Sequence, residues 1–163
     1  MEKLKQLQQT LLEKNLDAIL ITNPINRRYI TNFTGTAGVA LITQQEAIFI
    51  TDFRYTEQAN EQVKSFTVVE HKQEIEKEIA SHLKKLQIGK LAFEKDYVSY
   101  GQYEHYKTLF PVELAPVSGL IEQLRLMKSE KEIAILEQAA KIVDDAFTHI
   151  QSYIKPGVKE LDI

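Results

Sequence analysis

The chain has 163 residues, of which 44% are hydrophobic and 26% are charged, with a formal net charge of −3 and no cysteine. This composition is typical of a folded globular domain and excludes an intrinsically disordered chain. The small acidic charge favours neither nucleic acid nor a membrane as a partner, and the lack of cysteine excludes disulfides, thiolate zinc sites and a cysteine nucleophile.

The amino-terminal part predicts a helix, a buried strand and a second helix. Leucines at helical spacing predict an amphipathic helix over residues 2–14, and no apolar run approaches the roughly 20 residues that span a bilayer, so we expect a cytoplasmic protein. The continuous apolar run at residues 17–22 is typical of a strand covered on both faces. Asn23 before Pro24 indicates a helix N-cap and first position, with the helix running through Tyr29.

The middle of the chain predicts most of a sheet. Apolar segments at residues 39–43 and 46–51, separated by two glutamines, predict a hairpin. Asp52 is expected to cap a helix from Phe53 to about Glu61. Strands at 66–70 and 89–93, with a helix at 74–86 between them, predict a β-α-β crossover.

A further helix at 100–109 and a strand at 111–117 follow, and prolines place that last strand at an edge of the sheet. Together these elements predict the α/β class, with a mixed sheet of five to six strands covered by helices on both faces.

A long helix is predicted near the end of the chain. Ser129 and Glu132 form a capping-box pattern, and apolar residues from Ile133 to Ile150 lie along one helical face for about six turns. Only a short segment follows Pro156, so this face has nothing after it to pack on, which favours a truncated chain. The alternatives are that the helix folds back onto the sheet or dimerises.

Candidate chemistry is sparse. The four histidines occur singly, and the best local metal candidate is Asp145 with His149 one helical turn apart, for which a helix salt interaction is the simpler explanation. Neighbouring Asp144 points about 100° away from Asp145. No serine elbow and no phosphate-binding loop are present, and the Gly35 to Gly38 segment is interpreted as a plain turn.

Arginines next to tyrosines at two places in the chain are candidate carboxylate-binding groups, because guanidinium is the natural bidentate donor to a carboxylate. These are Arg27 and Arg28 beside Tyr29, and Arg54 beside Tyr55. The alternative is that each is an ion-pairing surface arginine next to a buried ring. From the residues alone, the sequence predicts an α/β domain without a self-contained catalytic site.

Three segments resemble the Xaa-Pro aminopeptidase, prolidase and creatinase family. Residues 26–38 are similar to Asn-x-x-Tyr-Leu-Thr-Gly-Phe-x-Gly, residues 51–59 to Thr-Asp-x-Arg-Tyr-x-Glu-Gln-Ala, and residues 124–133 to Leu-Arg-x-x-Lys-x-x-x-Glu-Ile. Residues 155–160 look like the Pro-Gly-x-x-Glu that follows the first catalytic-domain helix. Asn32 departs from the pattern, because the family often has glycine there.

The resemblance implies an amino-terminal α/β domain with a ribonuclease H-like sheet over residues 1–125. Residues 126–163 would then be the joint and first helix of a truncated pita-bread catalytic domain. That domain would hold two divalent metals, often manganese, through ligands beyond Ile163. The fragment is therefore expected to contain no catalytic residue and no metal ligand, and to have no peptidase activity of its own.

In such enzymes the amino-terminal domain mediates homodimerisation, and its loops edge the active site where a proline-containing peptide is cleaved. The matching substrate-edge positions are Phe33, Thr34, Gly35, Thr36, Arg54 and Tyr55. Two alternatives stay open. One is a creatinase-like amidinohydrolase, and the other is a non-catalytic module that binds peptides or dimerises.

Overall fold

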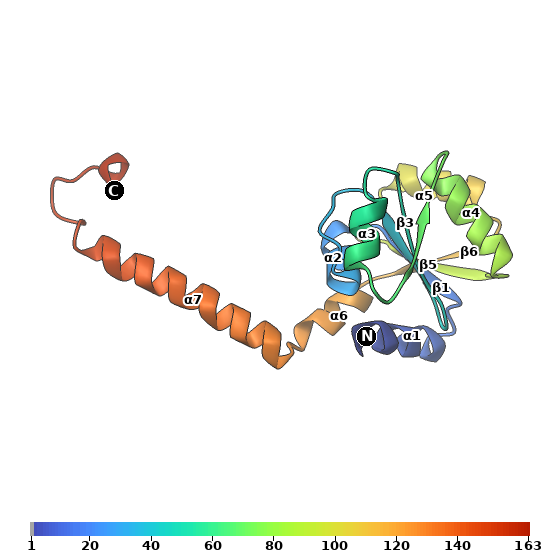
Figure 1. The fold of residues 1–163 in the computed structure, drawn as a ribbon, viewed down its shortest axis with the longest axis horizontal. Helices are drawn as coiled ribbons and strands as arrows, with labels where there is room; N and C mark the ends of the chain where they lie inside the picture. The colour runs from blue at the N-terminus through green and yellow to red at the C-terminus, as the bar shows by residue number, and fades with distance from the viewer. Residues whose placement is uncertain (1) are drawn as a thin grey trace. The chain divides into compact units, whose positions relative to one another are not determined.

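A computed structural model describes residues 2–163 and divides the chain after Arg125 into two compact units (Figure 1). The first unit contains the sheet and the second contains one long helix. In chain order the elements are α1 (Glu2–Glu13), β1 (Ala18–Ile21), α2 (Pro24–Thr31), β2 (Val39–Thr43), β3 (Ala47–Thr51), α3 (Thr56–Gln62), β4 (Thr67–Glu70), α4 (Ile75–Lys85), β5 (Lys90–Glu94), α5 (Tyr100–Leu109), β6 (Glu113–Val117), α6 (Leu120–Leu126), α7 (Glu130–Gln151) and η1 (Glu160–Asp162).

The first unit is built on a six-stranded mixed sheet in the order β4-β3-β2-β1-β5-β6. The pairs β1–β2 and β2–β3 are antiparallel, and the pairs β1–β5, β3–β4 and β5–β6 are parallel. The predicted hairpin is confirmed as β2 and β3. The predicted edge strand is confirmed as β6, where Pro116 needs no partner for its missing N–H.

Helices cover both faces of this sheet, as the sequence predicted. Side chains alternate between the faces of a strand, so each face of β1 contributes to a different core. Ile19 and Ile21 pack on one face with residues of α1, α2, α3 and α6. Ala18 and Leu20 pack on the other face with residues of α4 and α5. This double coverage is why residues 17–22 read as a continuous apolar run instead of an alternating one.

Three details differ from the sequence predictions. The helix expected to start at Phe53 begins at Thr56, because the carboxylate of Asp52 accepts hydrogen bonds from Arg54 and does not cap the helix. Helix α6 was not predicted, since it has only seven residues, of which Leu120, Ile121 and Leu124 pack on the core. The strands β4 and β5 are parallel, but three other strands lie between them, because β4 pairs with β3 and not with β5.

The second unit consists mainly of α7, which confirms the predicted long helix. The Ser129 hydroxyl accepts a hydrogen bond from the backbone N–H of Glu132, and the Glu132 carboxylate accepts one from the backbone N–H of Ser129. No residue of this 22-residue helix is buried, and Val143 and Phe147 are 66% and 61% exposed. Among the helices of residues 2–163, none combines the length and apolar character needed to cross a bilayer.

Candidate functional site

The family-like segments 26–38 and 51–59 contact each other, and Leu124 and Arg125 of the third segment contact helix α2. Its N-cap is Asn23, whose Oδ1 accepts hydrogen bonds from the N–H groups of Ile25 and Asn26. Its C-cap is Asn32, which adopts a left-handed conformation with φ of 61°. Asparagine tolerates this conformation better than most residues, so Asn32 makes the turn that glycine often makes in the family.

Arg27 lies on α2 and organises the loop of residues 33–38, which we call the substrate-edge loop after its predicted role. Its side chain is buried, with 5% of the residue exposed. The guanidinium donates to the carbonyl of Gly35 at 2.7 Å, to that of Gly38 at 2.6 Å and to that of Thr36 at 3.4 Å. Burial lowers the pKa of the guanidinium. Arg27 is therefore used inside the fold, which corrects its interpretation as a carboxylate-binding residue, whereas Arg28 is exposed.

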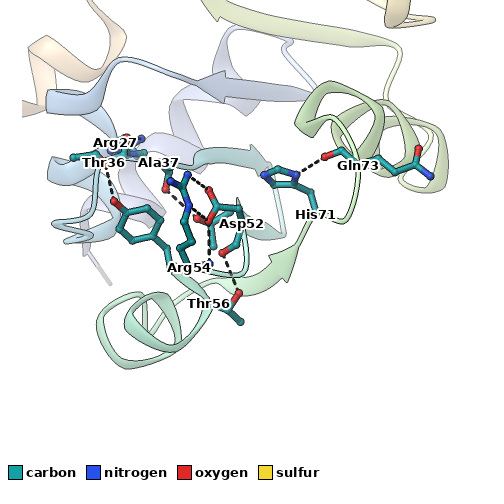
Figure 2. Close-up of polar contacts among 10 residues, drawn as sticks. Arg27, Thr36, Ala37, Asp52, Arg54, Thr56, His71 and Gln73 are labelled. Atoms are coloured by element: carbon teal, nitrogen blue, oxygen red, sulfur yellow. Dashed lines mark hydrogen bonds and ion pairs between the residues drawn. The ribbon is translucent and has the colours of Figure 1, made fainter.

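The loop is also tied to the strand β3 and the helix α3. The Thr36 hydroxyl lies 2.7 Å from the Tyr55 hydroxyl, and the Ala37 carbonyl accepts a hydrogen bond from the Thr51 hydroxyl at 3.0 Å (Figure 2). The N–H of Thr34 donates to Gln62 at 2.9 Å. The structure thus brings together Thr34, Gly35, Thr36 and Tyr55, four of the six predicted substrate-edge residues.

The two other predicted residues, Phe33 and Arg54, lie next to Tyr55 but differ from these four residues in their exposure. Arg54 has a side chain that is 63% exposed and forms a bidentate ion pair with Asp52, at 2.9 Å and 2.8 Å (Figure 2). Hydrogen bonds from this guanidinium hold the pKa of Asp52 below its usual range. Phe33 is 1% exposed, and its ring centroid lies 4.6 Å from that of Phe49 and 5.8 Å from that of Tyr55. Phe33 therefore holds the loop by packing in the core against Phe49 and Tyr55.

A surface groove of about 590 Å³ lies between helix α2 and the loop. Its lining includes Ile25, which is 59% exposed, together with Thr34, Gly35 and Thr36. Gly35 is required where the loop approaches its aromatic support, because a Cβ there would overlap Phe33 Cζ and lie 2.8 Å from Tyr55 Cδ1. The loop therefore lies directly on the aromatic rings beneath it.

A buried polar network that was not predicted from the sequence surrounds Glu94, at the end of β5. Glu94 is 8% exposed and accepts hydrogen bonds from the N–H groups of Thr22 and Asn23, each at 2.9 Å. It also accepts one from the Asn26 side chain at 2.8 Å. The only sequence signal for it was a glutamate ending an apolar strand.

Asn26 extends this network to α6, which we call the joint helix (Leu120–Leu126). The side-chain nitrogen of Asn26 also donates to Glu122 at 2.6 Å, and the side-chain oxygen of Asn26 accepts a hydrogen bond from Arg125 at 3.1 Å. One turn along α2, the Tyr29 hydroxyl donates to the carbonyl of Leu124 at 2.9 Å. Asn26 and Tyr29 are therefore in direct contact with residues 122–125, although they are almost 100 residues apart in the sequence.

The network leaves Glu94 with a raised pKa. Burial is the largest cause, the hydrogen bonds from Asn23, Asn26 and Thr22 oppose it, and the nearby carboxylate of Glu122 adds to it. Between the ordinary pKa of about 4.5 and the raised folded pKa, the folded state binds this proton more tightly than the unfolded chain. The contribution of Glu94 to stability therefore falls as pH rises through that window.

This dependence can be measured by urea unfolding of the wild type and Glu94→Gln at a series of pH values. We expect the wild-type free energy of unfolding, minus that of Glu94→Gln, to decrease as pH rises from about 4.5. Glu61→Gln, at an exposed position, is the matched control. A difference that is constant with pH would contradict the raised pKa.

Residues 2–163 contain no group of three or more histidine, aspartate or glutamate side chains placed to hold a metal ion. The Asp145 carboxylate pairs with Lys141 at 3.2 Å, so its helix salt interaction has a different partner from the predicted His149. His149 instead lies against Tyr153, with ring centroids 5.1 Å apart.

Comparison with known proteins identifies the class. The model of the creatinase/prolidase N-terminal domain matches residues 3–127, so the chain belongs to this domain family. It is 46% identical to an uncharacterized peptidase of Bacillus subtilis, over 99% of this chain and 46% of that protein. The chain thus spans about half the length of the curated relatives it matches.

Solved structures agree with this assignment. The Xaa-Pro dipeptidase from Bacillus anthracis is 49% identical, with a TM-score of 0.95 over 99% of this chain and 46% of that chain. The prolidase from Pyrococcus horikoshii is 30% identical, with a TM-score of 0.84 over the same shares. The predicted family and fold class are therefore confirmed.

Proposed function

We propose that this chain is the substrate-edge part of an Xaa-Pro peptidase, whose full-length form hydrolyses the bond between a first residue and proline. The observation that carries the proposal is the combination of family membership with similarity over 99% of the chain to an Xaa-Pro dipeptidase. The proposed contribution of residues 1–163 is to border the peptide site. The homodimer, the manganese ions and the cytoplasmic location stay predictions.

The loop with Thr34 and Thr36 is the proposed bordering element. Both side chains are exposed, and they lie beside a groove whose lining is partly apolar. The loop rests on buried aromatic rings and on the Arg27 guanidinium. Bordering a site requires groups held in place, because loosely held groups lose binding energy to ordering.

The metal-dependent step is not assigned to residues of this chain, because residues 2–163 present no fitting set of ligands. The two divalent metals proposed for the full-length protein would polarise the scissile carbonyl and supply a hydroxide nucleophile. Residues 1–163 are expected to act on binding and on substrate length.

The proposal is tested by assaying the full-length protein, with manganese, against an Xaa-Pro dipeptide, an Xaa-Pro tripeptide and creatine. We expect hydrolysis of the proline peptides and none of creatine. Thr36→Trp should narrow the peptide site and lower kcat/KM for the tripeptide by about tenfold more than for the dipeptide, which is typical of a steric conflict in a pocket.

Gln45→Trp is the matched control, because it places the same bulk on an exposed turn between β2 and β3. Equal effects of both substitutions would contradict the role of the loop. Hydrolysis of creatine alone would replace the proposed activity with that of an amidinohydrolase.

A further inference from the structure

The substrate-edge loop is held from inside by its backbone carbonyls. Four consecutive carbonyls, from Gly35 to Gly38, accept hydrogen bonds: three from the Arg27 guanidinium and one from the Thr51 hydroxyl. Residues 2–163 contain no cis peptide, and in a trans peptide the N–H points opposite to the preceding carbonyl. The N–H groups of Thr36, Ala37 and Gly38 therefore point away from these donors.

The joint helix is held by neighbouring residues of the same helix α2. Asn26 contacts Glu122 and Arg125, while Tyr29 contacts the backbone of Leu124. Positions three apart share one helical face, so Asn26 and Tyr29 face α6 together. Arg27, the next residue after Asn26, is directed to the loop instead.

Helix α2 is itself fixed at both ends. At its start, Glu94 accepts hydrogen bonds from the N–H groups of Thr22 and Asn23. At its end, the Thr31 hydroxyl donates to the Arg27 carbonyl at 2.7 Å and accepts from the N–H of Phe33 at 3.0 Å. Side-chain hydrogen bonds therefore define both ends of the helix that lies between the loop and α6.

We propose that α2 is a positioning element that fixes the substrate-edge loop relative to the joint helix, with Arg27 holding the loop and Asn26 and Tyr29 holding α6. This explains why the Asn-Arg-Arg-Tyr segment combines an amide, a guanidinium and a phenol within four residues. The effect of this positioning on catalysis rests on the proposed function, whereas the positioning itself does not.

Arg27→Lys tests whether Arg27 holds the loop, because an ammonium group keeps the charge but lacks the planar guanidinium that reaches several carbonyls. In the 163-residue chain, NMR order parameters of the backbone N–H groups of residues 35–38 should fall from about 0.85 to below about 0.6. Arg28→Lys, on the exposed neighbour, should leave them near 0.85. Unchanged values in Arg27→Lys, or an equal fall in Arg28→Lys, would overturn the proposal.

Asn26→Ala tests, by hydrogen exchange, whether Asn26 holds the joint helix. The amides of α6 should exchange at least about tenfold faster, because the helix loses both side-chain bonds to α2. Tyr29→Phe, which removes one hydroxyl and keeps the ring, should change exchange in the same direction if Asn26→Ala fails to fold. Exchange of α6 at the wild-type rate in both variants would overturn the proposal.

The full-length protein separates this inference from the proposed function. Arg27→Lys should raise KM for an Xaa-Pro dipeptide by about tenfold and change kcat by less than about threefold, because a binding border is displaced while the reacting groups are not. If the wild type hydrolyses no Xaa-Pro peptide, the proposed function fails. The order parameters and exchange rates still decide whether α2 positions the loop.

Discussion

Asn26→Asp is expected to lower the free energy of unfolding by about 3 kcal/mol at pH 7, because it replaces a buried donor with a carboxylate. Asn26 is 1% exposed and donates to the carboxylates of both Glu94 and Glu122. An ionised aspartate of the same shape donates to neither of them. It also places a negative charge next to the carboxyl groups of Glu94 and Glu122.

Urea unfolding measures this loss, and its pH dependence identifies the cause. Burial and the two neighbouring glutamates raise the pKa of the introduced carboxyl more than the one hydrogen bond from Arg125 lowers it, so the loss should shrink as pH falls and the group becomes protonated. Asn60→Asp makes the same change on the exposed side of α3 and should stay within about 0.5 kcal/mol of the wild type. A loss that is equal at the two positions would contradict the network.

Gly38→Ala is expected to destabilise the chain by about 2–4 kcal/mol, combining backbone strain with steric overlap. Gly38 has φ of 133°, which side-chain-bearing residues rarely adopt. A Cβ there would lie 2.7 Å from Phe49 Cζ and 3.0 Å from the carbonyl oxygen of Ile50. The backbone oxygen belongs to β3 and cannot move without disturbing the sheet.

Gly101→Ala is the matched control, because this position lies in α5 and nothing is within 4 Å of its built Cβ. Alanine has a higher helix propensity than glycine, so the control should be neutral or stabilising by up to about 1 kcal/mol in thermal or urea unfolding. If Gly38→Ala were as stable as the control, the tight approach of the loop to β3 would be wrong.

Local patterns were sufficient for most elements of the fold. The hairpin, the edge strand, the N-cap of α2 and the capping box of α7 each follow from residues within a few positions of one another. The start of α3 was wrong for a local reason, since Asp52 had two possible partners. Its carboxylate bonds to Arg54, which delays the helix to Thr56.

The candidate site was only partly predictable. The resemblance pointed to Thr34, Gly35, Thr36 and Tyr55, which the structure places together. It could not show that Phe33 lies in the core, or that the Arg27 guanidinium donates its hydrogen bonds to backbone carbonyls of the loop. The partners of Arg27 are carbonyls, which every residue has, so no side-chain pattern marks them.

By itself, the sequence determined the fold class, the family and most helices and strands, because periodicity, capping and turn chemistry act over short stretches of chain. Only the tertiary structure decided what the family-like segments do for one another. Glu94 and Asn26 are 68 residues apart, and Asn26 and Arg125 are 99 apart. Such contacts depend on the order and packing of the strands, which place α2 between the loop and the joint helix.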